Sequence, residues 1–391
     1  MVNILDRKLR NKYRILNYKN LILEKIRAYN EKKIINKIGV IEFHPCDFCD
    51  LNCFYCTYRW VVKGLKKEEK IYPFDKLYKI VKLEPKAIVV SGGGEPTLYK
   101  DGNKTFNDLI LYFAEEIPNV KIGLVTNGVF VPEGEWIKHV EWVRISIDAT
   151  NSETFAILKD GPFQNRLNSL FKYLKSPIKH VGIGFIYNRF NITEIPKAIK
   201  FFYNLITYEL GEDYIKKLNI QFRPTCPIES CNCPSKVYGD RSILMTPDLH
   251  TWWHRMLEKI SIEINQLKRD KKMRDFIENQ TNVHEITIQK KIVKIPSFRN
   301  CYISLIRWII RPNGDVYPCV MKASNREKKI GNIIRDSLDD LTLKSYEFYK
   351  LKDNYCKGPE VCCRMTGILQ ELIETNLDKD FEKKIPADPF F

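Results

Sequence analysis

Four cysteines fall within eleven residues of the sequence, Cys46-Asp-Phe-Cys-Asp-Leu-Asn-Cys-Phe-Tyr-Cys56, directly after an apolar run. Cys49, Cys53 and Cys56 have the spacing C-x3-C-x2-C. Three thiolates on one short loop can bind three irons of a [4Fe–4S] cluster and leave the fourth iron without a protein ligand. An open coordination position is typical of a catalytic metal site. The spacing therefore predicts a catalytic cluster at this loop.

Cys46 allows a second interpretation of the same stretch. Together with Cys49 it forms a C-x2-C pair, which could join Cys53 and Cys56 in a four-thiolate zinc site. Zinc-binding pairs are usually separated by a dozen or more residues, so that the chain can fold around the ion. Only three residues intervene here. The cluster is therefore the favoured interpretation, with Cys46 left outside it.

The elements that must position this loop follow from a regular alternation along the chain. Short β-rich segments alternate with amphipathic, helix-like segments, which predicts a parallel sheet with crossover helices: an open doubly wound sheet, a barrel or a partial barrel. The expected strands cover 38–43, 87–91, 121–126, 142–148, 180–188 and 219–224.

The unusual polar and glycine-rich sequences all follow the ends of expected strands, where α/β folds gather their chemistry. The cysteine loop follows the first strand, and Ser91-Gly-Gly-Gly-Glu-Pro96 follows the second. Thr126-Asn-Gly128 follows the third, and Ser146-Ile-Asp148 closes the fourth. Paired glycines allow a close backbone approach to a ligand, and a glutamate accepts hydrogen bonds from an ammonium. A phosphate loop is disfavoured at Ser91–Pro96 because no G-K-[ST] follows.

Taken together, these motifs resemble the radical S-adenosylmethionine (SAM) enzymes, whose signature C-x3-C-x-aromatic-C follows the first strand of a partial (βα)6 barrel. The resemblance covers about residues 38–225, with Tyr55 at the aromatic position. It implies an α/β fold, a catalytic cluster on Cys49, Cys53 and Cys56, and a set of contacts with S-adenosylmethionine. The residues expected to make those contacts are Tyr55, Gly93, Gly94, Glu95, Asn127, Ser146, Asp148, Lys159 and Ile186. Lys159 stands where the family more commonly has arginine.

The resemblance also implies a mechanism. S-adenosylmethionine chelates the open iron, and an electron from an external reductant such as flavodoxin or ferredoxin breaks its S–C5′ bond. The resulting 5′-deoxyadenosyl radical takes a hydrogen atom from the substrate.

A second group of cysteines surrounds a predicted hairpin over 306–320, which turns at Pro312-Asn-Gly314. Cys301, Gly314 and Cys319 form C-x12-G-x4-C, which resembles the opening of the SPASM and shorter twitch domains that carry auxiliary clusters. The full SPASM ending is absent, so we expect one auxiliary [4Fe–4S] cluster of twitch type. Its expected ligands are Cys301, Cys319, Cys356 and either Cys362 or Cys363.

A third group, Cys226, Cys231 and Cys233, has three open interpretations: a second auxiliary cluster, a single ligand or hydrogen donor, or no ligand role. Twelve cysteines in clusters indicate metal binding in a reducing compartment. The chain has no run of about 18 apolar residues and no signal-peptide pattern, so we expect a cytoplasmic protein with no membrane partner.

The domain boundaries follow the changes of pattern. We expect a basic helical extension, a radical SAM partial barrel, a helical linker and a twitch-like or SPASM-like domain with a tail, over 1–37, 38–235, 236–300 and 301–391. The formal net charge is +16, and residues 1–37 hold eleven Lys or Arg against three Asp or Glu. A solvated basic helix is favoured there over a binding surface for nucleic acid, an acidic peptide or a phosphorylated substrate.

The substrate has three candidate classes. SPASM and twitch domains accompany peptide and protein modification most often, such as crosslinking or epimerisation, so a peptide or protein is the first. A small molecule such as a sugar, aminoglycoside or nucleoside, to be dehydrogenated or isomerised, is the second. RNA modification through the basic extension and its aromatic residues, Tyr13, Tyr18 and Tyr29, is the third and least favoured.

Overall fold

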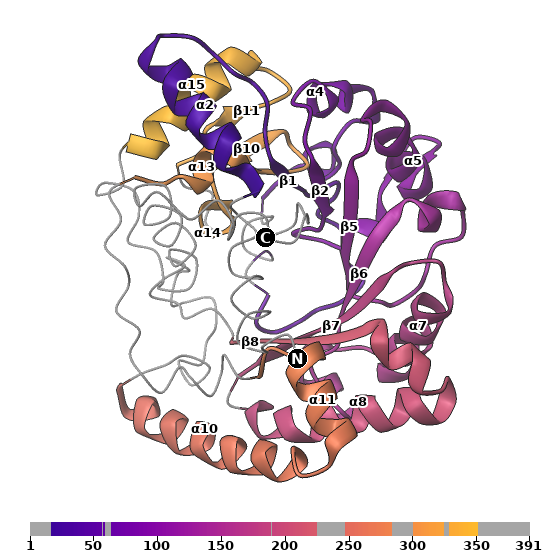
Figure 1. Cartoon of the computed structure of the whole chain (residues 1–391). Coiled ribbons are helices and arrows are strands. Elements are labelled where there is room, and N and C mark those ends of the chain that lie inside the picture. The colour runs from indigo at the N-terminus through magenta and orange to yellow at the C-terminus, as the bar shows by residue number, and fades with distance from the viewer. Residues whose placement is uncertain are drawn as a thin grey trace. The chain divides into compact units, whose positions relative to one another are not determined.

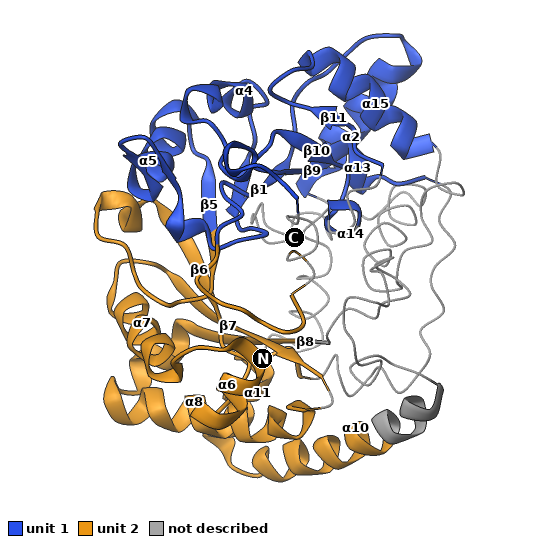
Figure 2. Ribbon diagram, turned by 180° about the vertical axis from the view of Figure 1, so that it is seen from behind, with its two compact units in different colours: residues 1–48, 61–123, 294–391 blue, residues 49–60, 124–293 orange. Residues whose placement is uncertain are grey.

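The structure is a computed structural model of the chain, and it describes residues 17–56, 58, 64–188, 190–224, 247–283, 300–323 and 328–350 (Figure 1). The chain divides into two compact units (Figure 2). Unit 1 comprises Met1–Phe48, Val61–Gly123 and Lys294–Phe391. Unit 2 comprises Cys49–Trp60 and Leu124–Val293. The chain therefore passes from one unit to the other inside the cysteine loop and again inside a strand, β5 (Lys121–Thr126).

Unit 1 is built around strand β1 (Val40–Phe43), all four residues of which are buried. Strands β2 (Ala87–Val90) and β9 (Arg307–Ile310) pair with β1 on its two sides, both in parallel. Strand β10 (Asp315–Tyr317) runs antiparallel to β9, and β11 (Gly331–Asn332) runs antiparallel to β10. The hairpin predicted over 306–320 is therefore confirmed. Its pairing with β1 was not predicted, and it joins the expected first strand of the barrel directly to the auxiliary region.

The helices of unit 1 include α4 (Tyr78–Val81) and α5 (Phe106–Glu116). Helix α5 begins at Thr105, whose backbone N–H and hydroxyl donate to the Asp108 carboxylate. This capping box satisfies groups that the first helical turn leaves without partners. Shorter elements of the unit are 3-10 turns over Lys67–Lys70, Phe74–Lys76 and Pro96–Leu98, strands β3 (Lys100–Asp101) and β4 (Lys104–Thr105), and helix α14 (Val320–Ala323).

The amino-terminal helix α2 (Lys19–Asn30) packs against α13 (Ile303–Ile306), which in turn packs against α15 (Leu338–Lys350). Helix α2 lies within the segment 1–37, where a basic helical extension was expected. Its aromatic residues are used for packing. Tyr18 is buried, and the Tyr29 ring lies 4.9 Å from that of Tyr346. These two side chains therefore serve the core of unit 1, and Tyr13 lies outside the described residues.

In unit 2, strands β6 (Val140–Ser146), β7 (His180–Tyr187) and β8 (Leu218–Pro224) pair in parallel in that order. Helices α6 (Ser152–Lys159) and α7 (Phe163–Lys175) connect β6 to β7, and α8 (Ile195–Glu209) connects β7 to β8. Helices α10 (Pro247–Leu267) and α11 (Lys271–Gln280) pack against α8. Shorter elements of the described part of unit 2 are 3-10 turns over Glu135–Lys138, Ile192–Glu194 and Glu212–Lys216. The expected strand–helix alternation is confirmed here.

One of the helix-like segments between the expected strands, 133–140, does not form an α-helix. It forms only a 3-10 turn over Glu135–Lys138. It begins after Gly134, which has a positive φ of 131°, and β6 begins at Val140. The glycine and the start of the strand confine the helical turn to this short segment. Its apolar residue Trp136 is buried and donates from Nε1 to the carbonyl of Pro132.

None of the helices in the part of the chain that the structure describes is long and apolar enough to cross a lipid bilayer.

Candidate cluster and cofactor site

The predicted cluster ligands Cys49, Cys53 and Cys56 lie on a loop of unit 2. Cys49 is exposed, and Cys53 and Cys56 are partly buried. The backbone N–H of Cys56 donates to the carbonyl of Cys53 at 3.1 Å, and the N–H of Phe54 donates to the carbonyl of Leu158 at 3.3 Å. The loop is therefore folded by its own turn and tied to the last turn of α6.

Tyr55 ties this loop to a buried set of polar side chains. The Tyr55 hydroxyl donates to Oδ2 of Asp148, which lies just beyond β6. The ammonium of Lys159, at the end of α6, lies 2.9 Å from the same oxygen and donates to the Ser146 hydroxyl at 2.6 Å. Tyr55, Asp148 and Lys159 are all buried. The predicted residues Tyr55, Ser146, Asp148 and Lys159 thus come together in one place.

Asp148 is also held from its other side. Its Oδ1 accepts from the backbone N–H of Ile186 at 2.7 Å. The Asn191 amide donates to the carbonyl of Asp148 at 2.7 Å and to that of Ile186 at 2.9 Å. Sequence reasoning missed Asn191, which is fully buried, because a single asparagine after a strand is most often a turn residue. Asp148 therefore anchors the chain itself, and its predicted contact with the cofactor stays a prediction.

The charges of this group are coupled to the cluster loop. Burial lowers the pKa of the Lys159 ammonium, but the neighbouring Asp148 carboxylate and Cys53 thiol outweigh burial, and the net pKa is raised. Burial raises the pKa of the Cys53 thiol, and Lys159 opposes that rise. Burial and the Asp148 carboxylate raise the pKa of Tyr55 well above its usual value. Lys159 thus remains a cation at neutral pH, next to a cysteine that must ionise to bind iron.

Asn127 contacts the cluster loop at its first cysteine. It follows β5, and its amide nitrogen lies 3.8 Å from Sγ of Cys49 and donates to Oδ1 of Asp50 at 2.6 Å. Its Oδ1 accepts from the N–H of Val129 at 2.8 Å. We predicted Asn127 as a cofactor contact. In this structure it fixes the loop that carries Cys49, and hydrogen bonds to cluster sulfurs influence reduction potential.

The predicted Gly93–Glu95 element lies in unit 1 and packs on the backbone that leads into the cysteine loop. A Cβ added to Gly94 would lie 2.2 Å from the carbonyl oxygen of Phe48, so only glycine fits there. The N–H of Glu95 donates to that oxygen at 2.6 Å. Gly94 is therefore required first by contact with the protein backbone, whereas sequence reasoning gave only an approach to a ligand.

The side chain of Glu95 is buried, and its Oε1 accepts from the N–H and hydroxyl of Thr97 at 3.1 and 2.6 Å. Cys46, predicted to lie outside the cluster, is also buried in unit 1 and donates from Sγ to the carbonyl of Glu95 at 3.1 Å. Cys46 thus joins the start of the cysteine loop to the loop that follows β2.

Of the predicted auxiliary ligands, Cys301 and Cys319 are described, and both are partly buried cysteines of unit 1. The N–H of Cys301 donates to the carbonyl of Tyr349 at 2.9 Å. The carbonyl of Cys319 accepts from the N–H groups of Lys322 and Ala323 at the start of α14. The other six predicted ligands lie outside the described residues: Cys226, Cys231, Cys233, Cys356, Cys362 and Cys363.

The residues at the loop fit a [4Fe–4S] cluster. Three cysteines could supply one thiolate for each of three irons. The buried Lys159 cation offsets part of their negative charge, and Asn127 presents an amide to Cys49. Within the described residues, no three His, Cys, Asp or Glu side chains are close enough to share a single metal ion. A cubane does not require that convergence, because each of its irons takes its own thiolate.

Comparison with protein families gives two matches. The model described as the radical SAM superfamily matches residues 43–202, and the SPASM model, described as an iron-sulfur cluster-binding domain, matches residues 301–364. The chain belongs to the radical SAM superfamily. It is thus an enzyme of a superfamily that uses a [4Fe–4S] cluster with S-adenosylmethionine, and its SPASM domain implies auxiliary iron–sulfur clusters. The number of those clusters stays a prediction.

Solved radical SAM structures share the fold. SuiB of Streptococcus suis, bound to precursor peptide SuiA, superposes with a TM-score of 0.54 at 14% identity, over 82% of this chain and 67% of that one. A hexahistidine-tagged anSMEcpe with bound AdoMet has a TM-score of 0.54 at 18% identity, over 90% and 98% of the two chains. The expected α/β fold of the radical SAM core is confirmed.

Among curated proteins, the chain matches the GTPase Obg of Brachyspira hyodysenteriae at 28% identity over 155 residues. The match spans 36% of this chain and 22% of that protein. The chain thus spans about a fifth of the length of this relative, and its sequence contains no G-x4-G-K-[ST] phosphate loop.

Proposed function

We propose that this radical SAM enzyme reductively cleaves S-adenosylmethionine at the loop of Cys49, Cys53 and Cys56 and abstracts a hydrogen atom from a peptide or protein. The observation that carries the proposal is the buried group of Tyr55, Asp148 and Lys159, which fixes the three-cysteine loop against the ends of β6 and α6. A structural loop would not need a cation buried beside one of its thiols.

The proposed roles follow from the contacts of each side chain. Cys49, Cys53 and Cys56 hold the cluster, and Lys159 compensates negative charge beside Cys53. Tyr55 and Asp148 fix the loop, and Asn127 orients Cys49. When bound, the cluster and S-adenosylmethionine together supply the electron transfer and the 5′-deoxyadenosyl radical. The protein positions these groups and limits competing reactions.

The predicted cofactor-binding residues have proposed roles of their own. The Gly93–Glu95 loop would receive the methionine amino group, since a buried carboxylate suits an ammonium. Ser146 and the segment around Ile186 would contact other groups of the cofactor. Cys301 and Cys319 contribute to an auxiliary cluster of the SPASM domain, together with cysteines beyond residue 350.

The peptide substrate is supported by proteins that share this fold over most of the chain. SuiB is bound to a precursor peptide, and native anSMEcpe is bound to AdoMet and a Cp18Cys peptide, with a TM-score of 0.50 at 17% identity. Both cover more than four-fifths of this chain, at 82% and 84%. The same chemistry on a peptide is therefore the function that we propose.

The active site is tested with the triple variant Cys49→Ala, Cys53→Ala and Cys56→Ala, reconstituted anaerobically and reduced. We expect no 5′-deoxyadenosine above background, while about four irons remain if one auxiliary cluster exists. Cys46→Ala is the matched control, since Cys46 lies on the same stretch and its Sγ donates to the carbonyl of Glu95 in unit 1. Production of 5′-deoxyadenosine by the triple variant would refute the assignment.

The substrate class is tested by mass spectrometry. Small peptides encoded beside this gene are incubated with the wild-type enzyme, S-adenosylmethionine and dithionite. We expect a mass change in one peptide that depends on the three cysteines. Modification of an aminosugar or nucleoside in the same assay, with all the peptides unchanged, would replace the peptide proposal with the small-molecule alternative.

A further inference from the structure

Unit 1 contains a buried ion pair between the cysteine stretch and the SPASM hairpin. Nη2 of Arg311 lies 3.0 Å from Oδ1 and 2.8 Å from Oδ2 of Asp47. The two side chains are 4% and 1% exposed. Asp47 lies between Cys46 and Cys49, and Arg311 directly follows β9.

The Arg311 end of this pair is rigid. Strand β9 is paired with β1 along its whole length, from Val40 with Arg307 to Phe43 with Ile310. The N–H of His44 continues that ladder to the carbonyl of Ile310 at 2.9 Å, and the N–H of Arg311 closes the hairpin turn on the carbonyl of Asp315.

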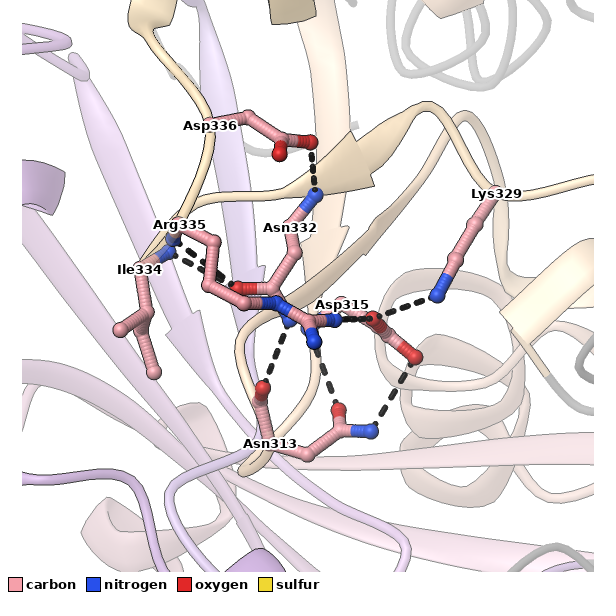
Figure 3. Close-up of polar contacts among 7 residues, drawn as sticks. All are labelled: Asn313, Asp315, Lys329, Asn332, Ile334, Arg335 and Asp336. Carbon is pink, nitrogen blue, oxygen red and sulfur yellow. Dashed lines mark hydrogen bonds and ion pairs between the residues drawn. The ribbon is translucent and has the colours of Figure 1, made fainter.

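A polar network around Asp315 holds the same turn (Figure 3). Asp315 accepts from the amides of Asn313 and Asn332 and from the ammonium of Lys329, each at 3.1 Å. The Asn332 amide also donates to the carbonyl of Asn313 at 2.8 Å. Arg311 is thus held by a hairpin that has little freedom to move.

The Asp47 end leads to the predicted cofactor loop. The N–H of Asp47 donates to the carbonyl of Lys70 at 2.8 Å. The next carbonyl, that of Phe48, accepts from the N–H of Glu95 and closely faces Gly94. The residue after Phe48 is the predicted cluster ligand Cys49. A displacement of Asp47 would therefore move both the Phe48 carbonyl that Glu95 contacts and the start of the cluster loop.

We propose that Arg311 is a positioning residue through which the SPASM hairpin holds the segment Cys46–Phe48 in the geometry that S-adenosylmethionine binding requires. The inference rests on the proposed function in one respect, the contact of Gly93–Glu95 with S-adenosylmethionine. It makes the auxiliary domain part of the cofactor site of the radical SAM core.

Stability alone does not account for this pair. Desolvation of a buried ion pair offsets most of its attraction, so an apolar pair of similar volume is often as stable or more stable. What a buried charge pair specifies is one relative position of its two segments. Arginine suits that role because it keeps its charge at every physiological pH and its donors are fixed in a plane.

The test compares Arg311→Met with Arg335→Met. Arg335 belongs to the same hairpin network but is 71% exposed and lies 4.0 Å from Asp315, so it is a matched control. Hydrogen exchange is measured on both proteins without added S-adenosylmethionine. We expect the amides of Asp47 and Glu95 to exchange at least tenfold faster in Arg311→Met than in Arg335→Met. Equal exchange in the two variants would overturn the inference.

A second measurement is the dissociation constant for S-adenosylmethionine, from titration of the reconstituted enzymes. We expect at least tenfold weaker binding in Arg311→Met and no change in Arg335→Met. Arg311→Lys, which keeps the charge, is the second variant. We expect its dissociation constant to lie between those of the wild type and Arg311→Met. If Arg311→Met does not fold, Arg311→Lys decides, and wild-type affinity and exchange in that variant would overturn the inference.

The double variant Asp47→Leu, Arg311→Met separates position from stability. We expect it to recover much of the stability lost by Arg311→Met, but not the affinity for S-adenosylmethionine. Recovery of both would show that the pair only stabilises the fold. Absence of 5′-deoxyadenosine from the wild-type reaction would refute the proposed function but not the role of Arg311. The exchange measurement still decides the role of Arg311 in that case.

Discussion

Two buried carboxylate–cation pairs lie near the cysteine stretch, one in each unit. In unit 2, Lys159 pairs with Asp148 from the far end of the helix that follows it, and Tyr55 joins them. In unit 1, Arg311 pairs with Asp47 across 264 positions of sequence. The first pair forms within one strand–helix connection. The second depends on the pairing of β9 with β1, which brings two distant segments together.

The two cations also differ in chemistry. The Lys159 ammonium shares its donors between Asp148 and the Ser146 hydroxyl, and lysine can lose its proton when it is buried without a carboxylate. Arginine does not deprotonate in proteins. If its carboxylate partner is removed, Lys159 can therefore become neutral, whereas Arg311 remains charged.

The largest expected effect comes from removing one carboxylate at a time. Asp47→Asn leaves a permanently charged Arg311 buried and should lower the free energy of unfolding by about 3–5 kcal/mol at every pH from 7 to 9.5. Asp148→Asn should cost a similar amount at pH 7 but less as pH rises. Without Asp148, burial lowers the pKa of folded Lys159 below that of the unfolded chain, so stability increases with pH in that window.

The measurement is urea unfolding of cluster-free protein at pH 7, 8 and 9.5, so that loss of iron does not enter the transition. Asp213→Asn is the control, since Asp213 and Lys216 form an exposed pair, 92% and 81% accessible, and its loss should change nothing measurable. Parallel pH profiles for Asp47→Asn and Asp148→Asn would contradict the distinction between the two cations.

A third basic side chain is buried in unit 1. Lys25 of α2 is fully buried with its ammonium 6.0 Å from the Trp308 ring centre, and it has no hydrogen-bond partner among the described residues. Burial lowers its pKa to about 7. The unfolded chain therefore binds one more proton between about pH 7 and pH 10.5, and wild-type stability rises with pH across that range.

Lys25→Met should remove that slope and stabilise the fold. From about 1.36 kcal/mol per pH unit, we expect a gain of about 3 kcal/mol at pH 8 and about 1 kcal/mol at pH 9.5. Lys350→Met is the control. Lys350 is exposed, and its ammonium lies 4.3 Å from the centre of the Tyr29 ring, which belongs to the same helix as Lys25. Urea unfolding at several pH values measures both variants. A gain that does not decline between pH 7 and pH 9.5 would count against a neutral Lys25.

The smallest expected effect concerns the hydroxyl that joins the loop to the unit 2 pair. Tyr55→Phe removes a hydrogen bond to a charged group and should cost about 1.5–3 kcal/mol. Tyr99→Phe in unit 1 is the matched control. Tyr99 is also buried, but it donates to a neutral acceptor, the carbonyl of Tyr72 at 2.9 Å, which should cost about 0.5–1.5 kcal/mol. Equal losses in urea unfolding would show that the Asp148 charge adds nothing to the contact.

Local patterns account for what could be predicted from the sequence. The strand–helix alternation and the hairpin at Pro312–Gly314 follow from periodicity and turn chemistry, which act within a few residues. Tyr55, Ser146, Asp148 and Lys159 were predicted through short motifs, and they lie together because one strand–helix connection brings them there. Asn191 escaped notice because its role depends on two backbone carbonyls, which leave no mark on sequence spacing.

The sequence by itself thus determined the α/β class, the three-cysteine loop and the glycine–glutamate element, because each of these is a local arrangement of residue types. The tertiary structure decided why Gly94 must be glycine, where Cys46 bonds, and that the SPASM hairpin extends the strand pairing of β1. It also decided that Arg311 meets Asp47. A contact between distant segments depends on the fold as a whole. The sequence around either residue therefore does not indicate its partner.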